Sequence, residues 1–307
     1  MMGIALQMSA QQVIQVAPDG VNDIQVIRQA IEQARLLNGA PAVIKLGGGT
    51  YELRRNQATV QKYYISNTMS WNSGTDNLKH IGIHLKNIRN LTIDGEGARL
   101  VTHGEMTSLV IDGCENVKLQ NIAVDAADPS VTEMTVESID GNEVIYKVHE
   151  TSTYQISGTT LRWVGEYGWA FTTNNPIQLY DPARDITWRT GSPTANATAI
   201  TALDNRRIRI TYSSLPSVKV GYTYQMRDGV RDQVAGFILK SKDITYDTVK
   251  MYFMGNFGIV CQYSENLSFT GCRFAPEEGS GRTNAGFADF LQVSGCKGLL
   301  KVEDSYF

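Results

Sequence analysis

The chain has 307 residues, a length that suits one large domain or two small ones. Its 28 Lys and Arg and 31 Asp and Glu residues leave a net charge of -3. That balance argues against a dedicated nucleic-acid binder, because such proteins carry a basic excess. A hydrophobic content of 42% excludes a disordered chain, and the lack of a run of about 18 apolar residues excludes a membrane-spanning helix.

The composition favours an all-β protein. Charged residues make up 19% of the chain, below the roughly 25% usual in soluble domains. Glycine is frequent with 28 residues, whereas proline is rare with 8. Thr, Val, Ile and Tyr, which suit strands, are abundant.

Residues 1–10, MMGIALQMSA, form a short apolar stretch that ends at Ser9 and Ala10 before polar Gln11. This pattern is typical of the end of a secretory signal peptide, although the positively charged beginning is missing. A disordered N-terminus would explain the same residues. We interpret them as a signal-peptide remnant and therefore expect an exported protein.

One amphipathic helix is predicted over residues 24–37. Either Asn22 or Asp23 can cap it, because a short side-chain oxygen accepts hydrogen bonds from the free amides of the first turn. Asn38 and Gly39 end it. The apolar residues that share one helical face are Ile24, Ile27, Ile31, Ala34 and Leu37. A buried strand follows over residues 42–46.

A short phrase recurs along the chain: a polar turn residue and then apolar, polar, apolar. Its clearest copies are residues 90–93 (NLTI), 116–119 (NVKL), 243–246 (DITY) and 266–269 (NLSF), and residues 300–302 (LKV) match its end. Strand-like alternation inside a period of about 20 to 35 residues is typical of stacked β coils. An ordinary β-sandwich does not predict the recurrence. We expect the helix to cover one end of this stack.

Between about residues 131 and 228 the phrase is absent and plain strand alternation replaces it. Asp140-Gly141-Asn142 is a hairpin-turn signal. We predict an inserted antiparallel barrel or sandwich over residues 131–228, which interrupts a coil region at 13–130 that resumes at 229–307. Trp163, Trp169 and Trp188 lie in this insert, either as core residues or at an edge that stacks on sugar.

The four cysteines, Cys114, Cys261, Cys272 and Cys296, lack CxxC spacing, so neither a zinc site nor a redox pair is indicated. Three of them follow a glycine, which predicts small buried residues stacked inside the repeat rather than disulfides. His80 and His84 would share one face of a strand. No carboxylate pattern completes a site around them, so we expect no metal.

Asp289 stands out because residues 286–293 (GFADFLQV) otherwise read as an apolar strand. A lone carboxyl group there must be paired or must have a raised pKa, because ionisation in apolar surroundings is costly. A raised pKa suits a general acid at neutral pH. The alternative is an Asp bonded to neighbouring backbone amides, and the residues themselves favour neither.

Residues 284–296 (NAGFADFLQVSGC) and 63–67 (YYISN) resemble the signature of glycoside hydrolase family 110, and the similarity covers about residues 13–307. The resemblance implies a right-handed parallel β-helix with an N-terminal capping helix and an inserted antiparallel β-barrel. It also implies a bacterial, secreted or periplasmic exo-α-1,3-galactosidase that works with inversion and without a metal or other cofactor. Its partner would be an α-galactosyl glycan.

By this resemblance Asp289 is the general acid. The family pattern continues with an adjacent Asp-Asp pair that serves as the base, and this sequence contains no such pair. We therefore expect the chain to be truncated at residue 307 and weakly active alone. Candidate substrate contacts, each of which could instead be structural, are Asn256, Gln262, Glu277, Arg282 and Gln292.

Two other functions stay open. A non-catalytic carbohydrate-binding β-helix gains weight from the missing base. A β-helix pectinase or polysaccharide lyase is disfavoured because Asn-Thr-Asp and Gly-His-Gly phrases and clustered basic residues are absent from the sequence.

Overall fold

The computed structural model describes residues 11–68, 77–174 and 176–307. The expected signal remnant, residues 1–10, lies outside the described residues. The described chain is mostly β structure and contains parallel sheets, which confirms the prediction at that level. None of its helices is long and apolar enough to cross a membrane.

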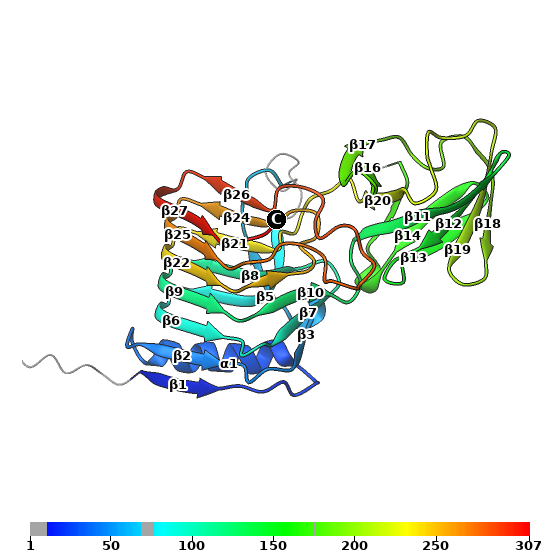
Figure 1. The fold of residues 1–307 in the computed structure, drawn as a ribbon. Helices are drawn as coiled ribbons and strands as arrows, with labels where there is room; N and C mark the ends of the chain where they lie inside the picture. Colours follow the sequence, from blue (N-terminus) through cyan, green and yellow to red (C-terminus); the bar gives the residue numbers. More distant parts are fainter. Residues whose placement is uncertain (1–10, 69–76, 175) are drawn as a thin grey trace, which may run out of the picture.

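Outside residues 131–227, the described chain passes repeatedly through the same three sheets, and each turn adds a strand to the stack (Figure 1). Sheet 1 contains β1 (Gln12–Gln15), β2 (Ala42–Lys45), β6 (Arg89–Asp94), β9 (Glu115–Gln120), β22 (Lys242–Asp247), β25 (Glu265–Thr270) and β27 (Lys297–Glu303). Sheet 2 contains β3 (Thr50–Arg54), β7 (Arg99–His103), β10 (Ala123–Ala126) and β23 (Lys250–Met251), extended by single bridges at Arg273 and Tyr306. Sheet 3 contains β4 (Thr59–Lys62), β5 (Leu78–Lys86), β8 (Thr107–Asp112), β21 (Gly236–Leu239), β24 (Ile259–Gln262) and β26 (Leu291–Ser294). The pairing between these strands is parallel except between β4 and β5.

The recurring phrase marks the point where each turn enters sheet 1. Its first residue takes a left-handed backbone, with φ of 54° at Asn90, 53° at Asn116 and 55° at both Asp243 and Asn266. Asn and Asp tolerate this conformation better than other residues with a Cβ. The side chains also bond between turns, since Asn116 Nδ2 donates to Asn90 Oδ1 at 2.8 Å and Asn266 Nδ2 to Asp243 Oδ1 at 2.8 Å.

A second ladder runs along the corner from sheet 3 to sheet 1. The amide of Ile88 donates to Cys114 Sγ at 3.5 Å, and the amide of Cys114 donates to Ser241 Oγ at 3.0 Å. The next turns continue it, from the Ser241 amide to Ser264 Oγ at 3.1 Å and from the Ser264 amide to Cys296 Sγ at 3.4 Å. Cys114 and Cys296 are therefore thiols built into these turns, and all four cysteines are free, as predicted.

The core runs through the middle of the stack. Ile93 pairs with Leu119 in sheet 1, and both are buried in one apolar cluster. Tyr246 lies one turn further on, and its ring centroid is 5.1 Å from that of Phe269. Inward residues of successive turns thus stack on one another, because a single turn cannot bury its own apolar face.

Helix α1 (Asp23–Leu36) lies against the first turn, beside β2 and β3 (Figure 1). Asn22 is its N-cap, and its Oδ1 accepts a hydrogen bond from the amide of Gln25 at 3.0 Å. The face predicted to be apolar is buried against the core, including Ile24, Ile27 and Ile31. Two short 3₁₀ helices, η1 (Arg55–Gln57) and η2 (Glu166–Gly168), complete the helical elements of the described residues.

The insert projects from one side of the stack (Figure 1) and has its own apolar core. Its larger antiparallel sheet contains β17 (Ile186–Arg189), β16 (Ile177–Asp181), β20 (Thr223–Arg227), β11 (Val131–Asp140), β12 (Glu143–Val148), β19 (Arg207–Tyr212) and β18 (Ala197–Leu203). A second sheet contains β13 (Thr153–Ser157), β14 (Thr160–Val164) and β15 (Ala170–Thr172). Trp163 and Trp169 are buried in this core and Trp188 packs against it, so they do not form an open sugar-stacking edge.

We expect Asn116→Ala to destabilise the stack by about 2 kcal/mol, because Ala resists the left-handed backbone and loses the bond to Asn90. The midpoint of urea unfolding, followed by circular dichroism, measures this effect. Asn116→Gly is the matched control, since it accepts the backbone conformation and should lose less stability. Equal losses for Ala and Gly would contradict the backbone explanation.

Candidate active site

One corner of the stack gathers the loops that lead from sheet 2 to sheet 3. We call it the insert corner and define it by residues 104–106, 127–235, 252–258 and 274–290. The insert enters the third turn here, between β10 and β21. The later loops are joined by backbone bonds, from the amide of Met254 to the carbonyl of Ala285 at 2.6 Å and from Gly258 to Asp289 at 3.0 Å.

A cavity of about 30 Å³ lies in the insert corner, lined by Glu105, Asp128, Ser130 and Asn256 among others. Its volume is sufficient for a water molecule. Asn256 is only 5% exposed, and its Nδ2 donates to the carbonyl of Val230 at 3.2 Å. Its Oδ1 is buried without a hydrogen-bond partner among the described residues. This oxygen is therefore a ready acceptor for a water or a hydroxyl group.

Two carboxyl groups in this cavity have raised pKa values. Burial raises the pKa of Glu105 to about 7, and the negative charge of Asp228 raises it further. A hydrogen bond from Ser130 acts in the opposite direction and lowers this pKa. Burial also raises the pKa of Asp128, although the amide of Glu166 donates to its Oδ2 at 2.5 Å. Glu105 can therefore gain or lose a proton near neutral pH.

Asp289 does not lie in an apolar strand, so that expectation was wrong. Strand β26 begins only at Leu291, and Asp289 is exposed on the bend before it. The apolar residues before β26 do not form a strand. Phe287 among them is buried in the insert corner. A side chain at Gly258 would lie 2.3 Å from the carbonyl oxygen of Phe290, so close packing shapes this bend.

Strand register places Asp289 relative to the other groups. Leu291 pairs with Ile259, so Asp289 stands one turn, about 4.8 Å, from Phe257. The same register continues through β21 to β8 and sets Asp289 three turns, about 14 Å, from Thr107. Glu105 precedes Thr107, so these two carboxyl groups do not form a catalytic pair.

Arg282 also lies in the insert corner, where it joins the last loop to the insert. Its Nη2 donates to the carbonyl of Asn284 at 2.9 Å, and its guanidinium lies 4.7 Å from the centroid of the Phe253 ring. Burial lowers its pKa, whereas the charge of Glu133 opposes that shift. Glu133 in turn accepts from the amide of Thr283 at 2.9 Å, so this loop is held from both sides.

The other predicted substrate contacts are bound to protein groups. Gln262 and Gln292 lie on sheet 3 and hold the 63–67 segment, through bonds from the amide of Ser66 to Gln262 Oε1 at 2.7 Å and from Gln292 Nε2 to Ser66 Oγ at 2.6 Å. Glu277 is bound to Arg99 Nη1 at 2.8 and 2.9 Å, beside β7. Three of the five predicted contacts, Asn256, Glu277 and Arg282, thus lie in the insert corner with Asp289, whereas Gln262 and Gln292 lie on sheet 3.

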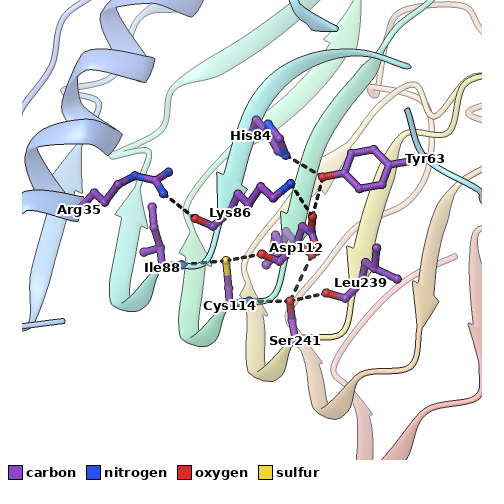
Figure 2. A network of polar contacts seen from close by, with 10 residues as sticks. Arg35, Tyr63, His84, Lys86, Ile88, Asp112, Cys114, Leu239 and Ser241 are labelled. Atoms are coloured by element: carbon purple, nitrogen blue, oxygen red, sulfur yellow. Dashed lines mark hydrogen bonds and ion pairs between the residues drawn. The ribbon is translucent and has the colours of Figure 1, made fainter. Parts of the chain in front are cut away.

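Tyr63, at the start of the 63–67 segment, belongs to another polar network (Figure 2). Its hydroxyl donates to Asp112 Oδ2 at 2.8 Å and lies 2.8 Å from His84 Nε2. Among the described residues, no three His, Cys, Asp or Glu side chains gather to hold a metal ion.

Sequence reasoning missed Glu105 and Asp128. Glu105 follows a glycine between two strands, a setting that resembles many surface turns. Its burial and its proximity to Asp228 depend on loops that are distant in the sequence, at residues 126–130, 228–235 and 253–256. No local pattern carries that information.

Replacing Glu105 should change how stability depends on pH. Its folded pKa of about 7 exceeds its ordinary value of 4.5, so the folded state binds the extra proton and loses stability as pH rises through this range. The free energy of unfolding of Glu105→Gln, relative to that of wild type, should therefore rise by about 2 kcal/mol from pH 5 to pH 8. Urea midpoints at both pH values measure this. The exposed control Glu150→Gln should follow wild type, and a Glu105→Gln difference independent of pH would refute the assignment.

Comparison with known proteins gives close relatives along nearly the whole chain. It is 43% identical over 305 residues to "Alpha-1,3-galactosidase A" of Bacteroides thetaiotaomicron, covering 99% of this chain and 53% of the relative. Proteins of the same name from Bacteroides fragilis and Streptomyces avermitilis are 34% and 36% identical over 93% and 87% of this chain, and 47% and 45% of their own lengths. No family model matches.

The chain thus spans about half the length of the curated relatives it matches. A solved structure from Parabacteroides merdae aligns with 94% of this chain at 10% identity and a TM-score of 0.34, a similarity too low to support an argument. The sequence relatives agree with the family indicated by residues 63–67 and 284–296. The chain belongs to the family of the alpha-1,3-galactosidases, glycoside hydrolase family 110.

Proposed function

We propose that this chain carries the general acid, Asp289, of a glycoside hydrolase that removes terminal α-1,3-linked galactose with inversion. The observation that carries the proposal is the 43% identity to a protein named alpha-1,3-galactosidase, over a range that includes Asp289. The exposed position of Asp289 on the last bend of the insert corner supports it, because an acid must reach the glycosidic oxygen of a bound substrate.

The stacked turns suit an inverting reaction. The acid protonates the leaving oxygen while a second carboxylate activates a water on the opposite face of the sugar, about 6.5–9.5 Å from the acid. Residues in register on successive turns stand about 4.8 Å apart, so a carboxylate two turns from Asp289, about 9.6 Å away, lies at the upper end of this range. The backbone bond from Gly258 to the carbonyl of Asp289 holds the acid at a fixed height in the stack.

Asn256 would support the acid by positioning substrate or water. It precedes Phe257, which is in register with Asp289 on the next turn, and its buried Oδ1 lacks a hydrogen-bond donor among the described residues. A neutral amide there can accept a hydrogen bond without adding charge beside the acid. Arg282 would act indirectly, because its contacts fix the loop that leads to Asp289.

The finer features of the architecture belong to the same proposal. We assign the stack as a right-handed parallel β-helix over residues 13–130 and 229–307, with the insert at 131–228 as a separate β-barrel. The parallel pairing and the separate apolar core of the insert support this assignment. We also propose that the protein is secreted or periplasmic, as the sequence of residues 1–10 indicates.

Asp289→Asn should reduce galactose release from α-1,3-galactobiose by about 10²–10⁴-fold, because the amide cannot donate the proton that the leaving sugar needs. The assay uses the protein that carries this chain. Asp304→Asn is the matched control. Asp304 is exposed directly after β27, and Asn tolerates the left-handed backbone found there. Near-normal turnover in Asp289→Asn would remove this residue from the mechanism.

The stereochemistry of the product gives a second test. We expect β-galactose to form first from the α-linked substrate, since water enters on the face opposite the leaving group. Proton NMR of the anomeric signals during the first minutes of hydrolysis measures this. Initial formation of α-galactose would contradict an inverting mechanism, and failure to release any galactose would favour the non-catalytic binding function.

A further inference from the structure

A groove of about 450 Å³ lies between α1 and sheet 3, at the first turns of the stack. Its size is within the range of small-molecule sites. The residues that line it are Arg28, Ile31, Glu32 and Arg35 from α1, Thr59 from β4, and Gly82, His84 and Lys86 from β5. Basic side chains therefore face the groove from both the helix and the sheet.

The positive charges in the groove are only partly balanced. Arg28 bonds to neutral acceptors, with Nη1 2.9 Å from Gln25 Oε1 and Nη2 3.2 Å from the carbonyl of Gln57. Arg35 Nη1 donates to the carbonyl of Lys86 at 2.9 Å, while its Nε lies 3.1 Å from the exposed carboxylate of Glu32. Each arginine thus keeps guanidinium charge that a carboxylate does not fully neutralise.

Lys86 is the cation on β5 and lies near His84 (Figure 2). Lys86 Nζ lies 3.6 Å from Asp112 Oδ2, a long ion pair, and Asp112 Oδ2 also accepts a hydrogen bond from the Tyr63 hydroxyl at 2.8 Å. That hydroxyl in turn receives a hydrogen bond from His84 Nε2. Burial and the charge of Lys86 lower the pKa of His84 against the charge of Asp112, and Arg35 and Arg28 lower it further, so all three cations lie within electrostatic reach of this imidazole.

We propose that this groove binds an oxyanion, and specifically a sulfate group carried by a saccharide. Arginines suit such groups because their planar forks donate paired hydrogen bonds, and the lysine adds a third donor from the opposite wall. Phosphate shares this chemistry, but the groove volume leaves space for a sugar attached to the anion. An anion there would balance the positive charge of Arg28, Arg35 and Lys86 that Glu32 and Asp112 leave unneutralised.

The groove is independent of the proposed catalytic site. It involves β5 in the first turn, whereas Asp289 precedes β26 in sheet 3, with β8, β21 and β24 between them. Those four steps correspond to about 19 Å. The proposal therefore concerns a second site that would hold a charged part of a glycan, and it does not require that Asp289 be an acid.

Isothermal titration calorimetry tests the proposal with four probes: galactose 6-sulfate, galactose, inorganic sulfate and inorganic phosphate. We expect galactose 6-sulfate to bind and galactose to bind much more weakly at this site. Lys86→Gln should weaken galactose 6-sulfate binding about tenfold or more, since one charge-assisted hydrogen bond is lost. Arg28→Lys, which keeps the charge but loses the fork, should weaken it less than Arg28→Gln.

Arg162→Gln, which removes an exposed cation on β14 of the insert, is the control for net charge and should leave binding unchanged. Thermal unfolding of each variant shows whether the groove still folds. Equal binding by wild type and a folded Lys86→Gln protein would overturn the proposal, as would no binding of any anion. Inorganic phosphate or sulfate binding as tightly as galactose 6-sulfate would overturn the saccharide as the source of the anion.

Discussion

The structure depends on the left-handed backbone that each turn adopts where it enters a new sheet. Without a positive φ at residues such as Asn116 and Gly113, the chain would continue past the corner and successive strands would lose their register. Asn, Asp and Gly meet this requirement at low cost. Once the corners are fixed, inward side chains of successive turns stack, and the core that runs from Ile93 to Phe269 follows.

The same constraint explains which features could be predicted from the sequence. The recurring phrase is local, because each corner needs its own Asn or Asp, and the period of α1 is equally local. The surroundings of Asp289 and Glu105 are not local. Their exposure or burial depends on how distant loops pack, as does the role of Gln292, whose partner Ser66 is more than 200 residues away in the sequence.

The insert is tied to the stack by more than its two connecting segments. His103 on β7 contacts carboxylates on both sides, Glu52 on the neighbouring turn and Glu166 of the insert, the latter at 2.9 Å from Nδ1. Glu133 of the insert also contacts the stack, because its carboxylate accepts a hydrogen bond from the amide of Thr283. The corner that contains Asp289 is therefore braced between two cores, which limits the movement of the loops that would surround a substrate.

The sulfur and hydroxyl ladder along the sheet 3 to sheet 1 corner also determines the chemical reactivity of the chain. Cys114 accepts a backbone hydrogen bond through Sγ, and burial raises the pKa of its thiol and that of Cys272. The thiolate is the nucleophile that attacks disulfides and oxidants, so a protonated and enclosed thiol reacts slowly. Such thiols can persist unpaired in an oxidising medium, where an exposed cysteine would be modified.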